Sequence, residues 1–173
     1  VKLANVESRL LMEQTLRGKG DIEFLKKSFG ELVANFTWWV NRKDRFGRNV
    51  FEGGFLGLDN IGVFDRSKPL PTGGFLEQAD GTAWMAFFAL NMLEIAVELA
   101  EDDPLYVELA VKFIEHFLWI AAAMDRVGVH QDEMWDEEDG FFYDLLRFPD
   151  GDGLRLKVRS VLGLLSIGAV GVL

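Results

Sequence analysis

A long apolar stretch at residues 78–101 places the strongest constraint on how this chain can fold. Its polar residues recur three or four positions apart, at Asn91, Glu94, Glu98 and Glu101. On a helix, that spacing gathers them into one narrow stripe and leaves the rest of the circumference apolar. The segment therefore predicts a helix that other parts of the protein cover on most sides.

An acidic turn follows this helix and predicts a second helix running back along it. Asp103 is a good capping residue, and Pro104 suits the first position of a helix because that position needs no backbone N–H donor. Polar residues then recur at Glu108, Lys112 and Glu115. Two such helices joined by a tight turn form an antiparallel αα-hairpin.

Helical periodicity also marks residues 6–16 and 22–40, and Asp21 is suited to cap the second of these helices. Near the other end, turn residues 149–153 separate two short apolar and aromatic runs, which predicts a β-hairpin within residues 141–158. The pattern as a whole indicates an all-α fold of successive αα-hairpins with this small β-hairpin insertion. Composition does not decide between an open solenoid and a closed toroid.

Charge and composition exclude some classes of function. The chain has 28 acidic and 18 basic residues, a net charge of -10, and no basic cluster of the kind that binds nucleic acid. It has no cysteine, which excludes disulfides and thiolate chemistry. Its uninterrupted apolar runs are too short for a membrane span, so no membrane partner is expected, and the compartment cannot be read. Because residues 160–173 are almost entirely apolar, we expect both ends to be cuts through a larger protein.

One glycine-rich segment, residues 51–60, has the composition of a catalytic loop. Apolar side chains and three glycines surround Asp59, with Glu52 nearby. Apolar surroundings raise the pKa of a carboxyl group, as a general acid requires, and glycines let a ligand approach the backbone. The alternative is that Asp59 only caps a turn.

Several segments resemble bacterial members of glycoside hydrolase family 63, which includes processing α-glucosidases. They are residues 38–43, 51–67, 76–86, 134–136, 140–144 and 156–160. The resemblance covers most of the chain from about residue 33 onward, and its long middle segment is highly specific. The tail departs from the family, which usually has a proline and bulkier residues at 166–171.

The resemblance implies that residues 1–173 are part of an (α/α)6 toroid, truncated at both ends, from an inverting enzyme that releases a terminal α-linked glucose or similar sugar. It places the family's general acid at Asp59, while the general base lies beyond this chain. Gly57, Asn60 and Glu77 are the candidate substrate-binding residues, although Glu77 with Asp80 also suits capping of the following helix. No metal or cofactor is implied, and the expected partner is a carbohydrate.

Two other functions remain open at the level of sequence. The chain could be an α-helical repeat protein that binds a partner, although it shows no internal repeat. It could also be a family member that binds carbohydrate without cleaving it. An acidic loop at residues 132–139 suggests calcium, but its spacing does not match a calcium loop and a solvated loop is the better interpretation.

Overall fold

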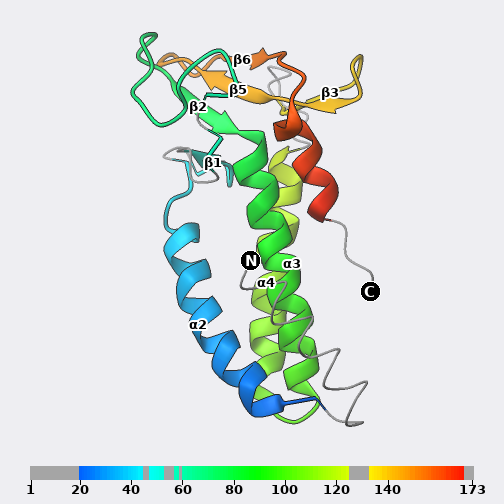
Figure 1. Ribbon diagram of the computed structural model, residues 1–173. Coiled ribbons are helices and arrows are strands. Elements are labelled where there is room, and N and C mark those ends of the chain that lie inside the picture. Colours follow the sequence, from blue (N-terminus) through cyan, green and yellow to red (C-terminus); the bar gives the residue numbers. More distant parts are fainter. Residues whose placement is uncertain (1–19, 45–46, 53–56, 59, 125–132, 170–173) are drawn as a thin grey trace.

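The computed structural model describes residues 20–44, 47–52, 57–58, 60–124 and 133–169. The helix expected at residues 6–16 lies outside them. The elements, in chain order, are α2 (Ile22–Val40), β1 (Phe51–Glu52), β2 (Phe75–Gln78), α3 (Ala79–Ala100), α4 (Leu105–Met124), β3 (Trp135–Asp136), β4 (Phe141–Phe142), β5 (Asp144–Arg147), β6 (Gly153–Leu156) and a 3-10 helix, η1 (Val161–Ala169). Figure 1 shows the long helices side by side, with the strands gathered across one end of them.

The predicted helix at 22–40 and its cap are confirmed by α2. The Asp21 carboxylate accepts a hydrogen bond of 3.0 Å from the backbone N–H of Phe24, which satisfies one of the free donors of the first turn. Apolar residues at helical spacing then face the core, and Leu25, Phe29 and Phe36 are almost completely buried. The cap and the apolar stripe together explain where α2 begins and how it packs.

The predicted αα-hairpin is also confirmed. α3 contacts α2, α4 and η1, so few of its residues reach solvent. At the turn, the Asp103 carboxylate accepts a hydrogen bond of 3.0 Å from the Leu105 N–H at the start of α4. α3 has the length and hydropathy of a membrane span, but 67% of that window is buried inside the protein. Burial in the core accounts for its apolar composition.

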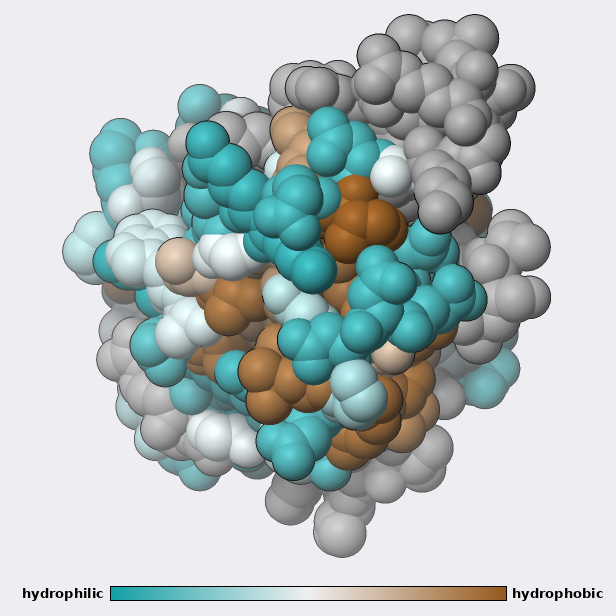
Figure 2. Space-filling model, turned by 90° about the horizontal axis from the view of Figure 1, so that it is seen from below, coloured by the Kyte–Doolittle hydropathy of each residue, from teal (hydrophilic) through white to brown (hydrophobic). Residues whose placement is uncertain are grey.

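The solvent-exposed side of α4 carries several large apolar side chains, although solvent-exposed positions are usually polar. Five large apolar side chains on this helix are at least half exposed: Leu105, Val107, Val111, Leu118 and Trp119. Figure 2 views the molecule from the end where α3 turns into α4, and it shows hydrophobic surface between hydrophilic side chains there.

The expected all-α toroid is wrong. β1, β2, β5 and β6 form a four-stranded antiparallel sheet in that order, and β3 pairs with β4 in a second sheet. The hairpin expected within 141–158 is present as β5 and β6, but it belongs to the larger sheet and is not an isolated insertion. β2 runs directly into α3 and pairs with β5, far along the chain. Strands of two to four residues are too short to show an alternating pattern in the sequence. Helical periodicity therefore predicted the helices and missed the four-stranded sheet.

Candidate functional site

The glycine-rich loop between β1 and β2 contains three of the four predicted site residues. Gly57 is exposed and has a positive φ of +74°, a conformation that glycine adopts at little cost. Asn60 is exposed in a turn. Asp59, the predicted general acid, lies outside the described residues. On either side of position 59 the described residues differ: Asn60 is exposed, whereas Leu58 is partly buried.

A buried arginine connects this loop to the body of the protein. Arg66 Nη1 donates hydrogen bonds to the Leu58 carbonyl oxygen at 3.2 Å and to Asp80 Oδ2 at 3.1 Å. Its Nη2 pairs with the other oxygen of Asp80, and its Nε lies 3.3 Å from Asp144 Oδ2. The side chain of Arg66 is 1% exposed. One guanidinium group thus joins the loop, the first turn of α3 and the start of β5.

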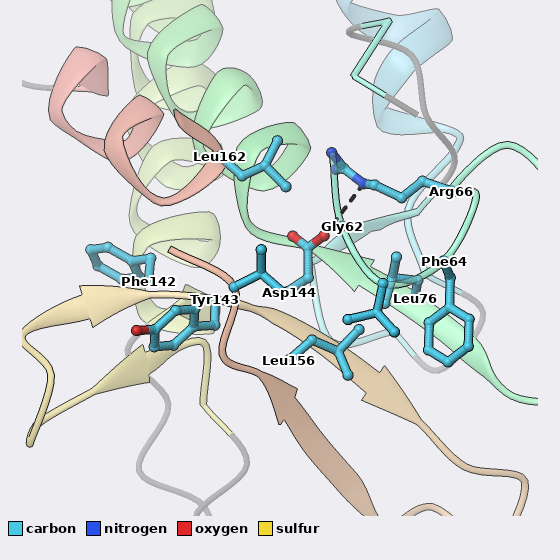
Figure 3. Close-up of a pocket in the computed structure, with 11 residues that line it drawn as sticks. Gly62, Phe64, Arg66, Leu76, Phe142, Tyr143, Asp144, Leu156 and Leu162 are labelled. Atoms are coloured by element: carbon cyan, nitrogen blue, oxygen red, sulfur yellow. Dashed lines mark ion pairs between the residues drawn. The ribbon is translucent and has the colours of Figure 1, made fainter. Parts of the chain in front are cut away.

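Asp144 is a buried carboxyl group of this cluster with a raised pKa. Burial disfavours its charged form and raises the pKa to about 6, although Arg66 and a hydrogen bond from the Ala79 N–H oppose the shift. Figure 3 shows its carboxylate facing Arg66 in a pocket closed by apolar side chains such as Leu162. The cavity measures about 10 Å³, room for one water molecule. Asp144 therefore cannot reach a sugar directly.

Glu77, a predicted substrate-binding residue, lies in β2 within a second buried ion pair. Its two carboxylate oxygens accept hydrogen bonds of 3.1 and 2.9 Å from Nε and Nη2 of Arg147 in β5. The two side chains are 3% and 1% exposed. Such a two-bond pair is the strong arrangement of arginine with a carboxylate. In this structure both oxygens of Glu77 hold neighbouring strands together, and neither oxygen is directed at solvent.

An open cleft lies beside the loop. It has a volume of about 580 Å³ and is lined by Arg42 and Lys43 after α2, by Glu52 of β1, by the loop segment from Arg66 to Leu70, and by the start of β2. That volume is within the range of small-molecule sites in proteins. Its wall has more apolar than polar surface, together with charged side chains such as Lys43, Glu52 and Lys68. Arg66 lines both this cleft and the water-sized cavity beside Asp144.

Asp65, the other aspartate of the loop, does not have the properties of a proton donor. Hydrogen bonds from Lys68 and Ser67 lower its pKa to about 2. Lys68 Nζ lies 2.8 Å from its Oδ2, and the Ser67 hydroxyl donates to Oδ1 at 2.6 Å. It therefore stays ionised at neutral pH. The structure shows that Asp65 closes a turn with Ser67.

Two aspartates of the acidic segment before β4 form ion pairs with basic residues that follow β6. Lys157 Nζ lies 2.8 Å from Asp136 and 3.3 Å from Asp139, and Arg159 lies 2.8 Å from Asp139. Hydrogen bonds from Lys157 and from the Asp139 N–H lower the pKa of Asp136, and hydrogen bonds from Tyr143, Arg159 and Lys157 lower the pKa of Asp139. Among the described residues no cluster of His, Asp or Glu has the arrangement of a metal site.

Sequence reasoning missed Arg66, Asp144 and Arg147 as parts of this region. Arg66 and Asp80 are 14 positions apart and Glu77 and Arg147 are 70 apart, so no local spacing links them. A buried arginine needs a carboxylate partner. That requirement signals that partners exist, but it does not identify them.

Comparison with known proteins identifies one informative relative. The chain is 51% identical, over 169 residues, to an uncharacterized protein of the yeast Saccharomyces cerevisiae. The match covers 91% of this chain and 15% of the yeast protein, so the chain spans less than one sixth of that relative's length. No protein-family model matches the chain.

Proposed function

We propose that this chain is part of a glycoside hydrolase that cleaves a terminal α-linked glucose, or a similar sugar, with inversion of configuration. Asp59 is the general acid that protonates the departing glycosidic oxygen. In an inverting enzyme the partner carboxylate stands roughly 6.5–9.5 Å away, with a water molecule between it and the sugar. The family resemblance puts that base in a segment outside this sequence.

The observation that supports this proposal best is the cleft beside the loop that carries Asp59. Its volume of about 580 Å³ has room for a sugar unit with its neighbour, and one wall is formed by residues 66–70 of the same loop. Leu58, the residue before Asp59, is fixed by the buried guanidinium of Arg66, which also lines the cleft. The carbonyl of Leu58 is therefore held by an arginine that also lines a ligand-sized space.

Four described carboxylates near the cleft are poorly suited to donate the proton. Asp65 has a lowered pKa and two hydrogen-bonding partners in its turn. Asp80 and Asp144 are buried against Arg66, and Glu77 is buried against Arg147. General acid catalysis needs a group that reaches the leaving oxygen within hydrogen-bond distance. These restrictions do not apply to Glu52, which lines the cleft, and the assignment of the acid to Asp59 rests on the family resemblance.

The test is an assay of the longest polypeptide that contains this segment, against a panel of α-linked glucosides and mannosides. Asp59→Asn should lower kcat by at least about 10²-fold, the typical contribution of a general acid, while the thermal unfolding curve stays in place. Asp103→Asn is the matched control, because it makes the same chemical change at the α3–α4 turn, and it should keep full activity. Sugar binding without hydrolysis by the unaltered protein would favour an inactive carbohydrate-binding protein.

A further inference from the structure

We propose that one side of α4 is the docking surface for a further helix of the same polypeptide. The partner helix carries apolar residues at alternating three- and four-residue spacing, with basic residues along one flank. The docking surface is a row of apolar side chains, the seam, made of Val107, Val111, Ile114, Leu118 and Ala121. The proposal does not depend on the proposed function, because none of these five residues lines the cleft.

The spacing of the seam points to a helix as its occupant. Its residues follow one another at intervals of four, three, four and three positions. This alternation averages about 3.5 residues, close to one turn of an α-helix, so the five side chains form a nearly straight row. Paired helices present such rows to one another, and the side chains of each fit between those of its partner.

The seam is distinct from the side of α4 that packs in the core. That side lies against α3, and Phe113 within it is completely buried. Val107, Val111 and Leu118 of the seam are instead 50%, 51% and 56% exposed. These three side chains extend the exposed apolar row over about three turns of the helix. A continuous exposed apolar surface of this kind marks an interaction site, whereas single exposed apolar residues are ordinary.

Two glutamates accompany the seam on one flank. Glu108 and Glu115 are exposed, and each directly follows a seam residue, so both lie beside the row at about the same angle on the helix. Lys112 is also exposed but lies further round the helix, away from the seam. Residues beside an apolar seam form ion pairs between helices and set the choice of partner. The acidic flank therefore favours a partner helix with Lys or Arg at the facing positions.

The charge argues against a second copy of this chain as the occupant. Two copies packed antiparallel through the seam would place the glutamates of one flank against the same glutamates of the other copy. Parallel packing would place that flank against the opposite side of the seam, where Ala110 and Phe117 carry no charge. Like charges across an interface oppose association, and the net charge of -10 on each chain adds to the repulsion.

The yeast relative indicates a source for the partner helix. The matched region is 15% of that protein, so most of its chain lies outside the match. A helix of the same polypeptide is held near the seam at a high effective concentration, which a separate partner lacks. These observations favour a segment outside residues 1–173 of the same polypeptide over a separate protein.

The first test is thiol labelling of Leu118→Cys in the longest polypeptide that contains this segment, with the labelled peptide identified by mass spectrometry. We expect labelling to be at least about 100-fold slower in the native protein than in urea, because a covered thiol reacts only when the structure opens locally. Lys112→Cys is the matched control on the same helix, and its two rates should agree within about threefold. Val111→Cys should repeat the result for Leu118→Cys. If both seam variants label as fast as the control, the seam is uncovered and the proposal is wrong.

Dilution distinguishes a helix of the same polypeptide from a second copy. The protection of Leu118→Cys should stay unchanged over about a 100-fold dilution, because binding within one chain does not depend on concentration. Protection that disappears as the protein is diluted to the monomer would show that a second copy covers the seam, and it would overturn the proposal.

Charge reversal tests the chemistry of the partner. Adding Glu115→Lys to Leu118→Cys should reduce the protection at least about tenfold, because a basic flank on the partner would then face a like charge. Adding Glu23→Lys, on the exposed surface of α2, should leave the protection unchanged. If Glu115→Lys behaves as Glu23→Lys does, the partner does not have the basic flank that we propose.

Discussion

The buried ion pair between Glu77 and Arg147 leads to a sharp prediction about stability. Substituting Glu77→Gln removes the charge that compensates Arg147, whose side chain is 1% exposed. Breaking a buried pair by altering one partner costs about 3–5 kcal/mol, because the other charge is left without compensation. Glutamine keeps one acceptor oxygen for one of the two hydrogen bonds, so we expect a loss near the lower end, about 3 kcal/mol.

The assay is thermal and urea unfolding followed by circular dichroism. For a chain of this length, about 1 kcal/mol corresponds to roughly 2–4 °C, so Tm should fall by roughly 6–12 °C. The double variant Glu77→Leu with Arg147→Met should be much closer to the unaltered protein, since apolar groups of similar size can replace a buried pair with little cost. Glu23→Gln is the surface control: it alters an ion pair with Lys26 in which Glu23 is 88% exposed, and it should change stability by less than about 0.5 kcal/mol.

A shift in Tm for Glu77→Gln no larger than that of Glu23→Gln would refute this reasoning. It would mean that the pair contributes little to the sheet and that the Glu77 carboxylate is available for another role. A variant that keeps its stability but raises KM several-fold would support the sequence-based prediction that Glu77 binds substrate. Loss of stability with unchanged KM in the folded fraction would assign Glu77 to the structure of the sheet.

Three further predictions concern packing, pH and capping. Gly163→Ala should lose about 1–3 kcal/mol in urea unfolding, because the added Cβ overlaps the Phe142 carbonyl oxygen; Gly168→Ala, with open space around it, should lose less than about 0.5 kcal/mol. Burial raises the pKa of Asp144 from 3.8 to about 6, so the folded protein binds this proton more tightly than the unfolded chain does. That contribution to stability is present below about pH 4 and is lost, by about 2–3 kcal/mol, as pH rises to about 6; Asp144→Asn should flatten this part of a stability–pH curve. Asp21→Ala removes the cap of α2 and should cost about 1 kcal/mol, measured by thermal unfolding, whereas Asp21→Asn should cost little.

The sequence was sufficient to predict elements whose signals are local. The helix at 22–40 has a cap and an apolar stripe within its own residues, and the α3–α4 hairpin has a buried helix followed by an acidic turn. The sheet was not predictable in this way. β1 has two residues, and β2 pairs with β5 across a separation of about 70 residues, so the pairing depends on how the whole chain folds.

The same distinction applies to the candidate site. The composition of residues 51–60 predicts a catalytic loop, because apolar and glycine residues around a carboxylate are visible in the sequence itself, and this stays a prediction. The anchoring of that loop was not visible. Asp65 is next to Arg66 in sequence, but the partners of Arg66 are Asp80 and Asp144, which reach it only through the packing of α3 against the sheet. The three-dimensional fold determines which residues form these ion pairs, and the separation of the residues in the sequence does not predict them.

The configuration of the released sugar is the most direct test of the central claim. Proton NMR of the reaction of an α-glucoside with the longest polypeptide containing this segment distinguishes the two anomers as they first form. An inverting enzyme with Asp59 as its acid predicts that β-glucose appears first, and that Asp59→Asn abolishes its release. First appearance of the α-anomer would contradict the inverting mechanism, and no release of sugar from any substrate of the panel would contradict the assignment of this chain to a glycoside hydrolase.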